Sequence, residues 1–457
     1  MAMSLDLLYG ISENAINLAK KLGADQAQAV VSTHVKNTAR FANSQINQNL
    51  STRNNEINIK VVVEKRLGSV KTSLSDQKSV QTAVRYAIRK ARATPPNEMF
   101  KSLPMPKEYV PIPRTYDRKT AECSPSLGAE IVNNAIETAH TSNIVKAVAG
   151  SYMTGSTSFA VVNSRGVHAD MRISIARLHV TVISAKNGSE GFGSSESWAR
   201  KMDEINVSAV AQNAAETSAK SVQPERLEPG EYETVLSPEA VAVSMEHLGA
   251  SFKGTWYQDG ISFVKNNIGK KVLDEKFNLK DDARDMSTLY VSAVDGEGVP
   301  KRPVSMVHAG VVDENSICYN SYTAGRVGLQ STGHAQAPFF VRFEEEEEDI
   351  INMIVSPGDS STDEMIKETQ HGVYVSRFHY VRSVNRPNVT VTGLTRDGTF
   401  LIKNGELARP VHNLRFTDSF LDAYKNIKMI GREQVRTQRA TVPSLKIAKL
   451  RFSGIAE

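Results

Sequence analysis

The stretch EYETVLSPEAVAVSMEHLGASF, residues 231–252, contains the clearest strand-to-helix transition in the chain. Residues 231–236 have the composition of a short strand. Ser237 can cap a helix through its hydroxyl, Pro238 suits the first helical position, and Glu239 places a carboxylate in the first turn. The apolar residues that follow at helical spacing are Val241, Met245, Leu248 and Phe252. The stretch therefore predicts a strand followed by an amphipathic helix.

Two α/β units are expected before this stretch. In the first, apolar spacing predicts a helix over residues 11–22, three strands with a turn around Gly68 before the third, and a helix that ends at Thr94. Residues 95–115 contain six prolines and are expected to form a linker or surface arm.

The second unit is expected to begin with a helix over residues 127–139. Its strand pattern over residues 173–182 changes parity near Ala176, which predicts a bulge. Asn187 and Gly188 predict a turn, and an alanine-rich helical pattern closes the unit over residues 203–220.

The chain after residue 226 is expected to be mainly β. Its short strand-like runs lie at residues 290–294, 304–307, 389–392 and 400–402. The fold class predicted is α+β, with an N-terminal α/β part followed by a mainly β C-terminal domain. The domain boundaries expected are 1–110, 111–225 and 226–457.

Composition excludes several classes of protein. The 457 residues are 40% hydrophobic and carry 55 Lys and Arg against 50 Asp and Glu, a net charge of +5. That net charge is too small for a chain of this length to indicate a nucleic-acid-binding surface, so no nucleic-acid partner is expected. Cys123 and Cys318 are the only thiols, and neither a signal peptide nor a membrane span is recognisable. A cytoplasmic protein without a membrane partner is therefore expected, and the acidic run from Glu344 to Asp349 is interpreted as a solvated loop.

Catalytic motifs are sparse. The chain has neither a G-x-S-x-G elbow nor a phosphate-binding glycine motif followed by lysine. None of its ten histidines is spaced to place two imidazoles on one metal ion. Glu246 with His247 comes nearest to a metal motif, but a partly exposed pair with no metal is the favoured interpretation.

Segments along nearly the whole chain nevertheless resemble the TldD and PmbA (TldE) family of metallopeptidase-related proteins. Near the start these are LGADQAQAV, then Arg40, Phe41, Ala42 and Asn43, and ARATPP. VVNSRG follows in the middle of the chain. Further on they are LEPGEYETVLSPEAV, DGISFVKNNIGKKV, DGEGVPKRP, TAGRVGLQSTGHAQAP, HGVYVSRF, FLIKNGELARPV and VPSLKIAKLRF. Each segment is weak alone, and the order and spacing together carry the resemblance.

The zinc motif of the catalytic branch is absent. The resemblance implies His-Glu-x-x-x-His on the helix after Pro238 and a further cysteine near the chain end. Counting back from Gly260 places Met245 and Ala250 at the two histidine positions and Glu246 at the glutamate position, and residues 427–441 contain no cysteine. Because zinc requires imidazole, thiolate or carboxylate donors, the sequence resembles the zinc-free PmbA or TldE branch.

The resemblance implies a non-catalytic E-type subunit. Such a chain carries no metal or other cofactor, forms a homodimer or a heterodimer with a zinc-bearing D-type subunit, and acts on unfolded peptides. Arg40, Phe41 and Asn43 fall in the opening motif, either as substrate or interface contacts or as a packed strand edge. The alternative is an autonomous peptidase with a site rebuilt from Glu246, His247, His308, His334 and His371. A role as a DNA gyrase modulator, also attributed to the family, is not supported by the charge.

Overall fold

A six-stranded antiparallel sheet forms the N-terminal half, with the strand order β3-β2-β1-β4-β5-β6. The computed structural model describes residues 3–140, 142–339 and 347–455. Because β1 pairs with both β2 and β4, the first two expected units share this one sheet. Its strands are β1 (Gln26–Ala42), β2 (Gln45–Val63), β3 (Arg66–Thr72), β4 (Val145–Asn163), β5 (His168–Lys186) and β6 (Ser189–Ala199).

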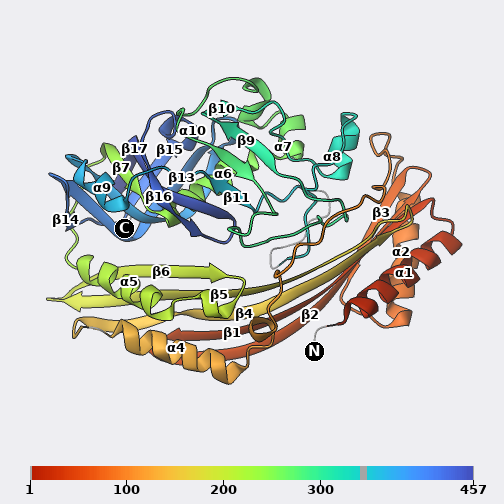
Figure 1. Ribbon diagram of the computed structural model, residues 1–457, viewed down its shortest axis with the longest axis horizontal. Coiled ribbons are helices and arrows are strands. Elements are labelled where there is room, and N and C mark those ends of the chain that lie inside the picture. Colours follow the sequence, from red (N-terminus) through yellow and green to blue (C-terminus); the bar gives the residue numbers. More distant parts are fainter. Residues whose placement is uncertain (1–2, 141, 340–346, 456–457) are drawn as a thin grey trace.

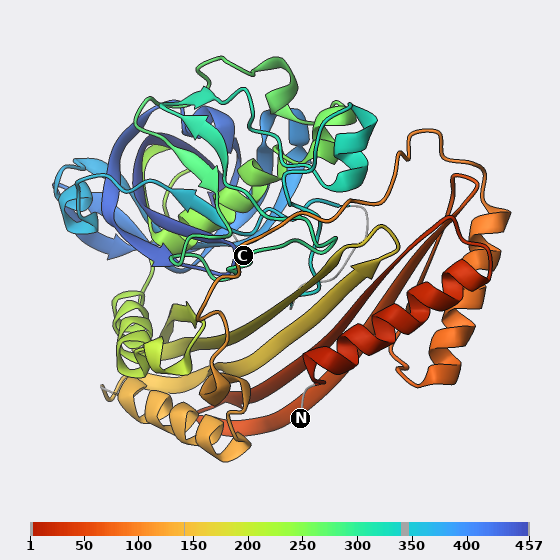
Figure 2. The same cartoon turned by 45° about the vertical axis from the view of Figure 1, so that its right-hand side comes forward.

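Helices cover one face of this sheet, and the C-terminal half covers the other (Figures 1 and 2). On β1, alternation places Ala27, Ala29 and Val31 in the cluster beneath the first two helices, while Val30 packs with residues of the C-terminal half. The helices of this half are α1 (Leu5–Lys21), α2 (Gln77–Ala93), α3 (Arg118–Ala121), α4 (Pro125–Ala139) and α5 (Val207–Lys220), with the 3₁₀ turn η1 (Met202–Glu204).

The bulge predicted near Ala176 is wrong. Strand β5 pairs with β4 without interruption at this position. Met171, Ile173 and Ile175 pack toward the C-terminal half, whereas Ala176 and Leu178 pack beneath α4 and α5. The parity of the apolar residues therefore changes because the first part of β5 buries one face of the strand and the later part buries the opposite face.

The turn predicted around Gly68 lies earlier in the chain. Glu64 and Lys65 adopt positive φ angles of 50° and 61°, and Val63 pairs with Arg66 across them. Gly68 lies inside β3, where a Cβ atom would stand 2.2 Å from the carbonyl oxygen of Ala87 in α2. Its role is close helix packing, while the turn predicted at Asn187 and Gly188 is confirmed.

An eleven-stranded sheet forms most of the C-terminal half, which agrees with the predicted β-rich region. Residues 290–294 form no strand. Tyr290 and Val294 are instead buried in the apolar cluster between the two halves, which accounts for the apolar character of this run. Residues 390–392 and 400–402 lie in one strand, β13. The strands are β7 (Gly230–Leu236), β8 (Leu279–Asp281), β9 (Val304–His308), β10 (Val311–Val312), β11 (Met353–Val355), β12 (His371–Asn385), β13 (Thr390–Lys403), β14 (Glu406–Pro410), β15 (Leu414–Ser419), β16 (Ile427–Arg436) and β17 (Ala440–Ile455).

The helices of the C-terminal half are few and mostly short. They are α6 (Pro238–Ala250), α7 (Gly254–Gln258), α8 (Ser321–Arg326), α9 (Thr362–Lys367) and α10 (Phe420–Ala423), with the 3₁₀ turns η2 (Phe263–Asn266) and η3 (Arg386–Asn388). None of the helices in the described ranges is long and apolar enough to cross a membrane.

A shared apolar cluster joins the two halves. Phe159 of β4 packs edge-on against Phe339, with ring centroids 6.2 Å apart, and Ile173 of β5 belongs to the same cluster. The proline-rich residues 95–115 form no helix or strand, as expected of a linker. Phe100 and Leu103 in this segment are nevertheless buried, so part of it is packed against the protein.

Close packing of α5 on β6 makes a first prediction. At Gly193 an added Cβ atom would lie 2.2 Å from the carbonyl oxygen of Ala214, so Gly193→Ala is expected to lower the free energy of unfolding by about 1–3 kcal/mol. The matched control is Gly10→Ala in α1, where a Cβ meets nothing within 4 Å and about 0.5–1 kcal/mol of stabilisation is expected. Urea unfolding followed by circular dichroism measures both; equal effects would contradict the packing described.

Candidate functional site

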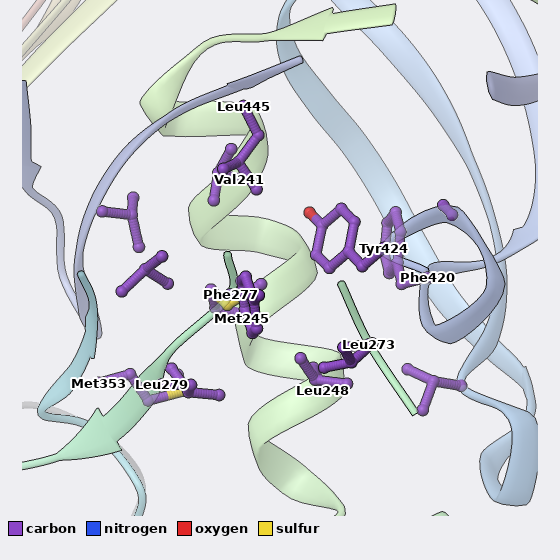
Figure 3. Close-up of a cluster of buried hydrophobic side chains, with 14 of the residues drawn as sticks. Val241, Met245, Leu248, Leu273, Phe277, Leu279, Met353, Phe420, Tyr424 and Leu445 are labelled. Atoms are coloured by element: carbon purple, nitrogen blue, oxygen red, sulfur yellow. The ribbon is translucent and has the colours of Figure 1, made fainter. Parts of the chain in front are cut away.

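Helix α6 begins as the sequence predicts. The Ser237 hydroxyl accepts a hydrogen bond from the Ala240 backbone N–H at 3.3 Å, Pro238 occupies the first turn, and Glu239 follows it. The predicted apolar stripe is fully buried (Figure 3). Its four residues, all at 0% exposure, are Val241, Met245, Leu248 and Phe252.

Burial of this stripe fixes the rotation of α6 about its axis. It therefore determines which side chains lie on the opposite side of the helix, its open face. Met245 lies in the core beside Phe277, so its sulfur is enclosed by hydrophobic side chains (Figure 3). Glu246 is exposed, and Ala250, which has no donor atom, is half-buried. The residues present therefore do not fit the zinc site that the resemblance associates with this helix.

The charge of Arg439 affects the pKa of Glu246. Protein around Glu246 desolvates its carboxylate and raises its pKa, and Arg439 partly offsets that rise. Arg439 lies between β16 and β17, within the segment 427–441 in which the resemblance places a cysteine ligand, and it pairs with Asp349 at 3.6 Å. A fixed cation at this position opposes the binding of a divalent metal ion.

A second group of charged side chains faces α6 from the N-terminal sheet. Arg177 of β5 binds Glu196 of β6 through two nitrogens, at 2.7 and 3.0 Å, and its guanidinium lies 5.0 Å from the Trp198 ring centroid. The indole N–H of Trp198 donates to Glu196 at 3.0 Å. Burial alone would raise the pKa of Glu196, but the charge and hydrogen bonds of Arg177 more than offset it and lower the pKa.

Glu239 links α6 to this group. Its carboxylate accepts a hydrogen bond from the Glu196 backbone N–H at 3.4 Å. Burial, followed by the negative charge of Glu196, raises the pKa of Glu239 to about 8. Burial beside Arg177 lowers the pKa of His179 to about 4, and its imidazole lies 3.0 Å from the Ser194 hydroxyl. Glu239 is therefore largely protonated at neutral pH, while His179 is neutral.

The opening-motif residues separate in space. Arg40 pairs with Ser151, Ser151 with His179, and His179 with Glu196, so Arg40 lies on the same sheet face as the charged group. Phe41 points to the other face and is buried at 2% exposure.

Asn43 occupies the turn between β1 and β2 with φ 50°. The strand-edge interpretation of this motif is wrong, because β1 lies between β2 and β4.

The candidate histidines lie in separate surroundings. His334 is fully buried and lies 3.2 Å from Asp281, whereas His247 packs near Phe420. His371 is exposed beside Tyr232, and His308 is exposed in the β9–β10 hairpin. Across residues 3–140, 142–339 and 347–455, no group of three or more His, Cys, Asp or Glu is placed to hold a metal ion.

The interpretation of the acidic run as a solvated loop is wrong for its described part. Glu348 is 1% exposed and accepts hydrogen bonds from the hydroxyls of Thr255 and Thr323. Asp349 is 5% exposed, and Glu347 pairs with Lys253 at 2.8 Å. These carboxylates have internal partners that a like-charged sequence run does not reveal, and residues 344–346 lie outside the described ranges.

Sequence analysis missed the charged group on β5 and β6. The sequence feature that could have indicated this group is alternation. Arg177 and His179 in β5, and Glu196 and Trp198 in β6, stand at alternate positions between small or apolar residues. Strand pairing, which a single sequence does not give, brings the two alternations together.

The chain matches two family models over most of its length. Residues 114–222 match the model described as the PmbA/TldA metallopeptidase central domain, and residues 229–454 match its C-terminal domain. These matches define a class of metallopeptidase-related protein. The chain belongs to the PmbA/TldD family.

Known proteins agree with this membership. Metalloprotease PmbA of Escherichia coli O157:H7 is 22% identical over 457 residues, which cover 96% of each chain. A metalloprotease of Methanothermobacter thermautotrophicus is 24% identical over 316 residues, 66% of each chain. The crystal structure of TldE from Thermococcus kodakarensis superposes with a TM-score of 0.88 at 20% identity, covering 97% of this chain and 99% of that one.

Glu239 makes the stability of the protein depend on pH. Its pKa rises from 4.5 to about 8 on folding, so the folded state holds an extra proton between those values and stability falls as pH rises through this window. Glu239→Gln removes the titration, and between pH 5 and 9 the variant is expected to lose about 1–3 kcal/mol less than the parent. Thermal unfolding at both pH values tests this, with exposed Glu433→Gln as control; parallel losses in all three proteins would contradict it.

The histidines predict a contrast in stability. His334→Ala is expected to cost about 3–5 kcal/mol, because it leaves the buried Asp281 carboxylate with the Asn352 backbone N–H but without its imidazole partner. His371→Ala removes an exposed ring and is expected to change stability by less than about 0.5 kcal/mol. Urea unfolding compares the two, and a small effect at His334 would show that its pairing is not structural.

Proposed function

We propose that this chain is a non-catalytic, E-type subunit that assembles with a zinc-bearing, D-type subunit of the same family to cleave unfolded peptides. The open face of α6 is the observation that carries the proposal. It carries Glu246 at the glutamate position, but Met245 is turned into the core and Ala250 has no donor atom, and the charge of Arg439 acts on the Glu246 carboxylate.

Chemistry at this face supports the proposal. When bound in a catalytic relative, zinc supplies an activated water molecule at neutral pH. Glu246 has a raised pKa, as a general base needs, but it has no activated nucleophile to deprotonate. The glutamate alone is therefore expected to contribute nothing to peptide hydrolysis by this chain.

The sheet face opposite α6 suits the handling of a peptide. Arg40, Ser151 and His179 form a polar row across three neighbouring strands, and Arg177 stacks against Trp198 nearby. Hydroxyl, imidazole and guanidinium groups offer hydrogen bonds to peptide carbonyls without selecting one sequence. We expect this row to contact the substrate and take no part in bond cleavage.

Assembly completes the proposal. A permanent interface needs on the order of 2,000 Å² of buried surface. We expect a heterodimer with the D-type subunit, and a homodimer when that subunit is absent, in the cytoplasm. The alternative, an autonomous peptidase rebuilt around Glu246, would require histidines that the fold places in separate surroundings.

A mixing experiment tests the proposed function. Metal content and hydrolysis of an unfolded peptide are measured for this chain alone, for a D-type subunit alone, and for their mixture. This chain alone is expected to bind less than 0.1 equivalent of zinc and to show background hydrolysis, whereas the mixture cleaves the peptide. Chelator-sensitive hydrolysis by this chain alone would establish the autonomous alternative instead.

A variant in this chain sharpens the test. Glu246→Gln is expected to leave the activity of the mixture within twofold, with exposed Glu433→Gln as matched control. A loss of more than tenfold for Glu246→Gln alone would show that this glutamate takes part in the reaction.

A further inference from the structure

A long stretch of the N-terminal sheet has an open edge. Strand β2 covers Gln45–Val63, but β3 pairs with it only over residues 57–63. Over residues 45–56, β2 pairs with β1 on one side, and no strand within the described ranges pairs with its other side. This part of β2 is therefore one border of the sheet (Figure 2).

The main-chain groups of alternate residues point outward from this edge. The turn before β3 has two residues and closes on a hydrogen-bonded pair, so the N–H and C=O groups of Val63 point toward β3. Val62 points the opposite way, because its carbonyl accepts a hydrogen bond from the Asp25 N–H at 2.8 Å on the β1 side. The register with β1 has no shift from Gln48 onward. The odd-numbered residues 49–55 therefore point their main-chain groups away from β1.

The composition of this edge does not protect it. Residues 45–56 contain neither proline nor lysine, and their only charged residues are Arg53 and Glu56. The register shift with β1 falls at Asn47, so the strand is regular beyond it. Leu50, near the middle, is 47% exposed. Because open edges in soluble proteins are usually blocked by such residues or covered by another element, we expect this edge to be covered in the assembled protein.

Symmetry restricts how a second copy of the chain can cover the edge. In an antiparallel pair, residues that point outward face each other, so odd-numbered residues meet odd-numbered ones and the two-fold axis passes through a residue position. A centre later than Leu50 brings the β1–β2 turn of the second copy against β3, and an earlier centre shortens the pairing. With the centre at Leu50 the two exposed leucines meet. Asn49 then faces Ser51 of the second copy, Gln48 faces Thr52, and no like charges stand opposite each other.

We propose that residues 45–56 of β2 pair antiparallel with the same residues of a second copy of this chain, centred on Leu50. The two six-stranded sheets then continue into one. The inference rests on the proposed function in expecting a homodimer when the D-type subunit is absent, and it assigns the interface of that homodimer. The regular part of the pairing gives about four main-chain hydrogen bonds. Because the contact is small, a micromolar dissociation constant is expected.

The same pairing joins the inner faces of the two sheets. Leu50 pairs with Thr38, Thr38 with Met153, and Met153 with Arg177, so Leu50 shares the sheet face of the charged group opposite α6. Even-numbered residues meet even-numbered ones across the axis, so this face of one copy continues into the same face of the other. Each copy therefore extends the polar surface, including Arg40, that we expect to contact the substrate.

Sedimentation velocity of this chain alone tests the proposal, over about 1–200 µM. The parent chain is expected to dimerise reversibly, and Ser51→Pro to weaken the dimer at least tenfold, because it removes an N–H group that points outward from the edge. Proline is tolerated in an edge strand when its nitrogen faces solvent, so the variant is expected to fold, as circular dichroism verifies. A dimer that Ser51→Pro leaves intact would place the contact on another face and overturn the proposal.

A charge exchange tests the centre of the pairing. Leu50→Lys and Leu50→Glu are each expected to weaken the dimer at least tenfold, because like charges then meet at the axis. An equimolar mixture of the two is expected to dimerise within threefold of the parent chain. The matched control is Leu407→Lys, an exposed leucine of β14, with an expected change below twofold. Equal losses at both leucines, or a mixture that stays monomeric, would overturn the assignment.

Cross-linking gives an independent measure of the register. Opposed residues of a non-hydrogen-bonded pair have Cα atoms about 4.5–5.5 Å apart, a separation that a disulfide can bridge. Leu50→Cys is therefore expected to form a covalent dimer on mild oxidation. Thr52→Cys is the matched control, because the two cysteines would stand about 13 Å apart and remain reduced. Cys123 and Cys318 are buried and do not compete. Efficient cross-linking through Thr52→Cys alone would overturn the centre at Leu50.

Other occupants of the edge give different outcomes. A parent chain that stays monomeric at 200 µM overturns the proposal. If that monomer binds an unstructured peptide, or a D-type subunit, less tightly after Ser51→Pro, the edge belongs to that ligand instead. The self-association assays contain no D-type subunit and measure no cleavage. Their failure therefore leaves the proposed function untouched, and a mixture that fails to cleave peptide leaves the self-association result standing.

Discussion

Burial of the apolar stripe on α6 fixes the rotation of that helix, and the arrangement of the charged groups depends on this rotation. Val241, Met245 and Leu248 are fully buried in the C-terminal core, so Glu239 and Glu246, seven residues apart, share the opposite side. That side meets the N-terminal sheet, where the Glu196 backbone N–H donates to Glu239. The hydrophobic effect thus decides which ionisable groups face one another.

Much of this arrangement follows from the sequence. Ser237, Pro238 and the stripe predicted the start and the buried face of α6 because a cap and a 3.6-residue period are local signals. The helix–strand–helix order of the N-terminal half was likewise predicted from local signals. The parity change near Ala176 was misread because one sequence does not tell which face of a strand is covered along its length.

The charged groups were less predictable. Glu196 meets Arg177 through the pairing of β5 with β6, and Glu239 reaches Glu196 only through packing of the two halves. Glu348 looked solvated among like charges, yet threonines from two distant segments bury it. Long-range packing therefore overrode what composition indicated. It also placed Phe41 beneath the helices and Asn43 in the β1–β2 turn, where a packed strand edge was one interpretation.

Sharing one sheet between two segments has a consequence for synthesis of the chain. Gln28 of β1 pairs with Asn163 of β4, so β1 leaves the ribosome long before its second neighbour exists. During that interval one side of the strand exposes unpaired amide and carbonyl groups, which invite mispairing with other nascent chains. Pairings this distant in sequence slow folding. A holding chaperone that shields β1 until β4 is translated would therefore raise the yield of native protein.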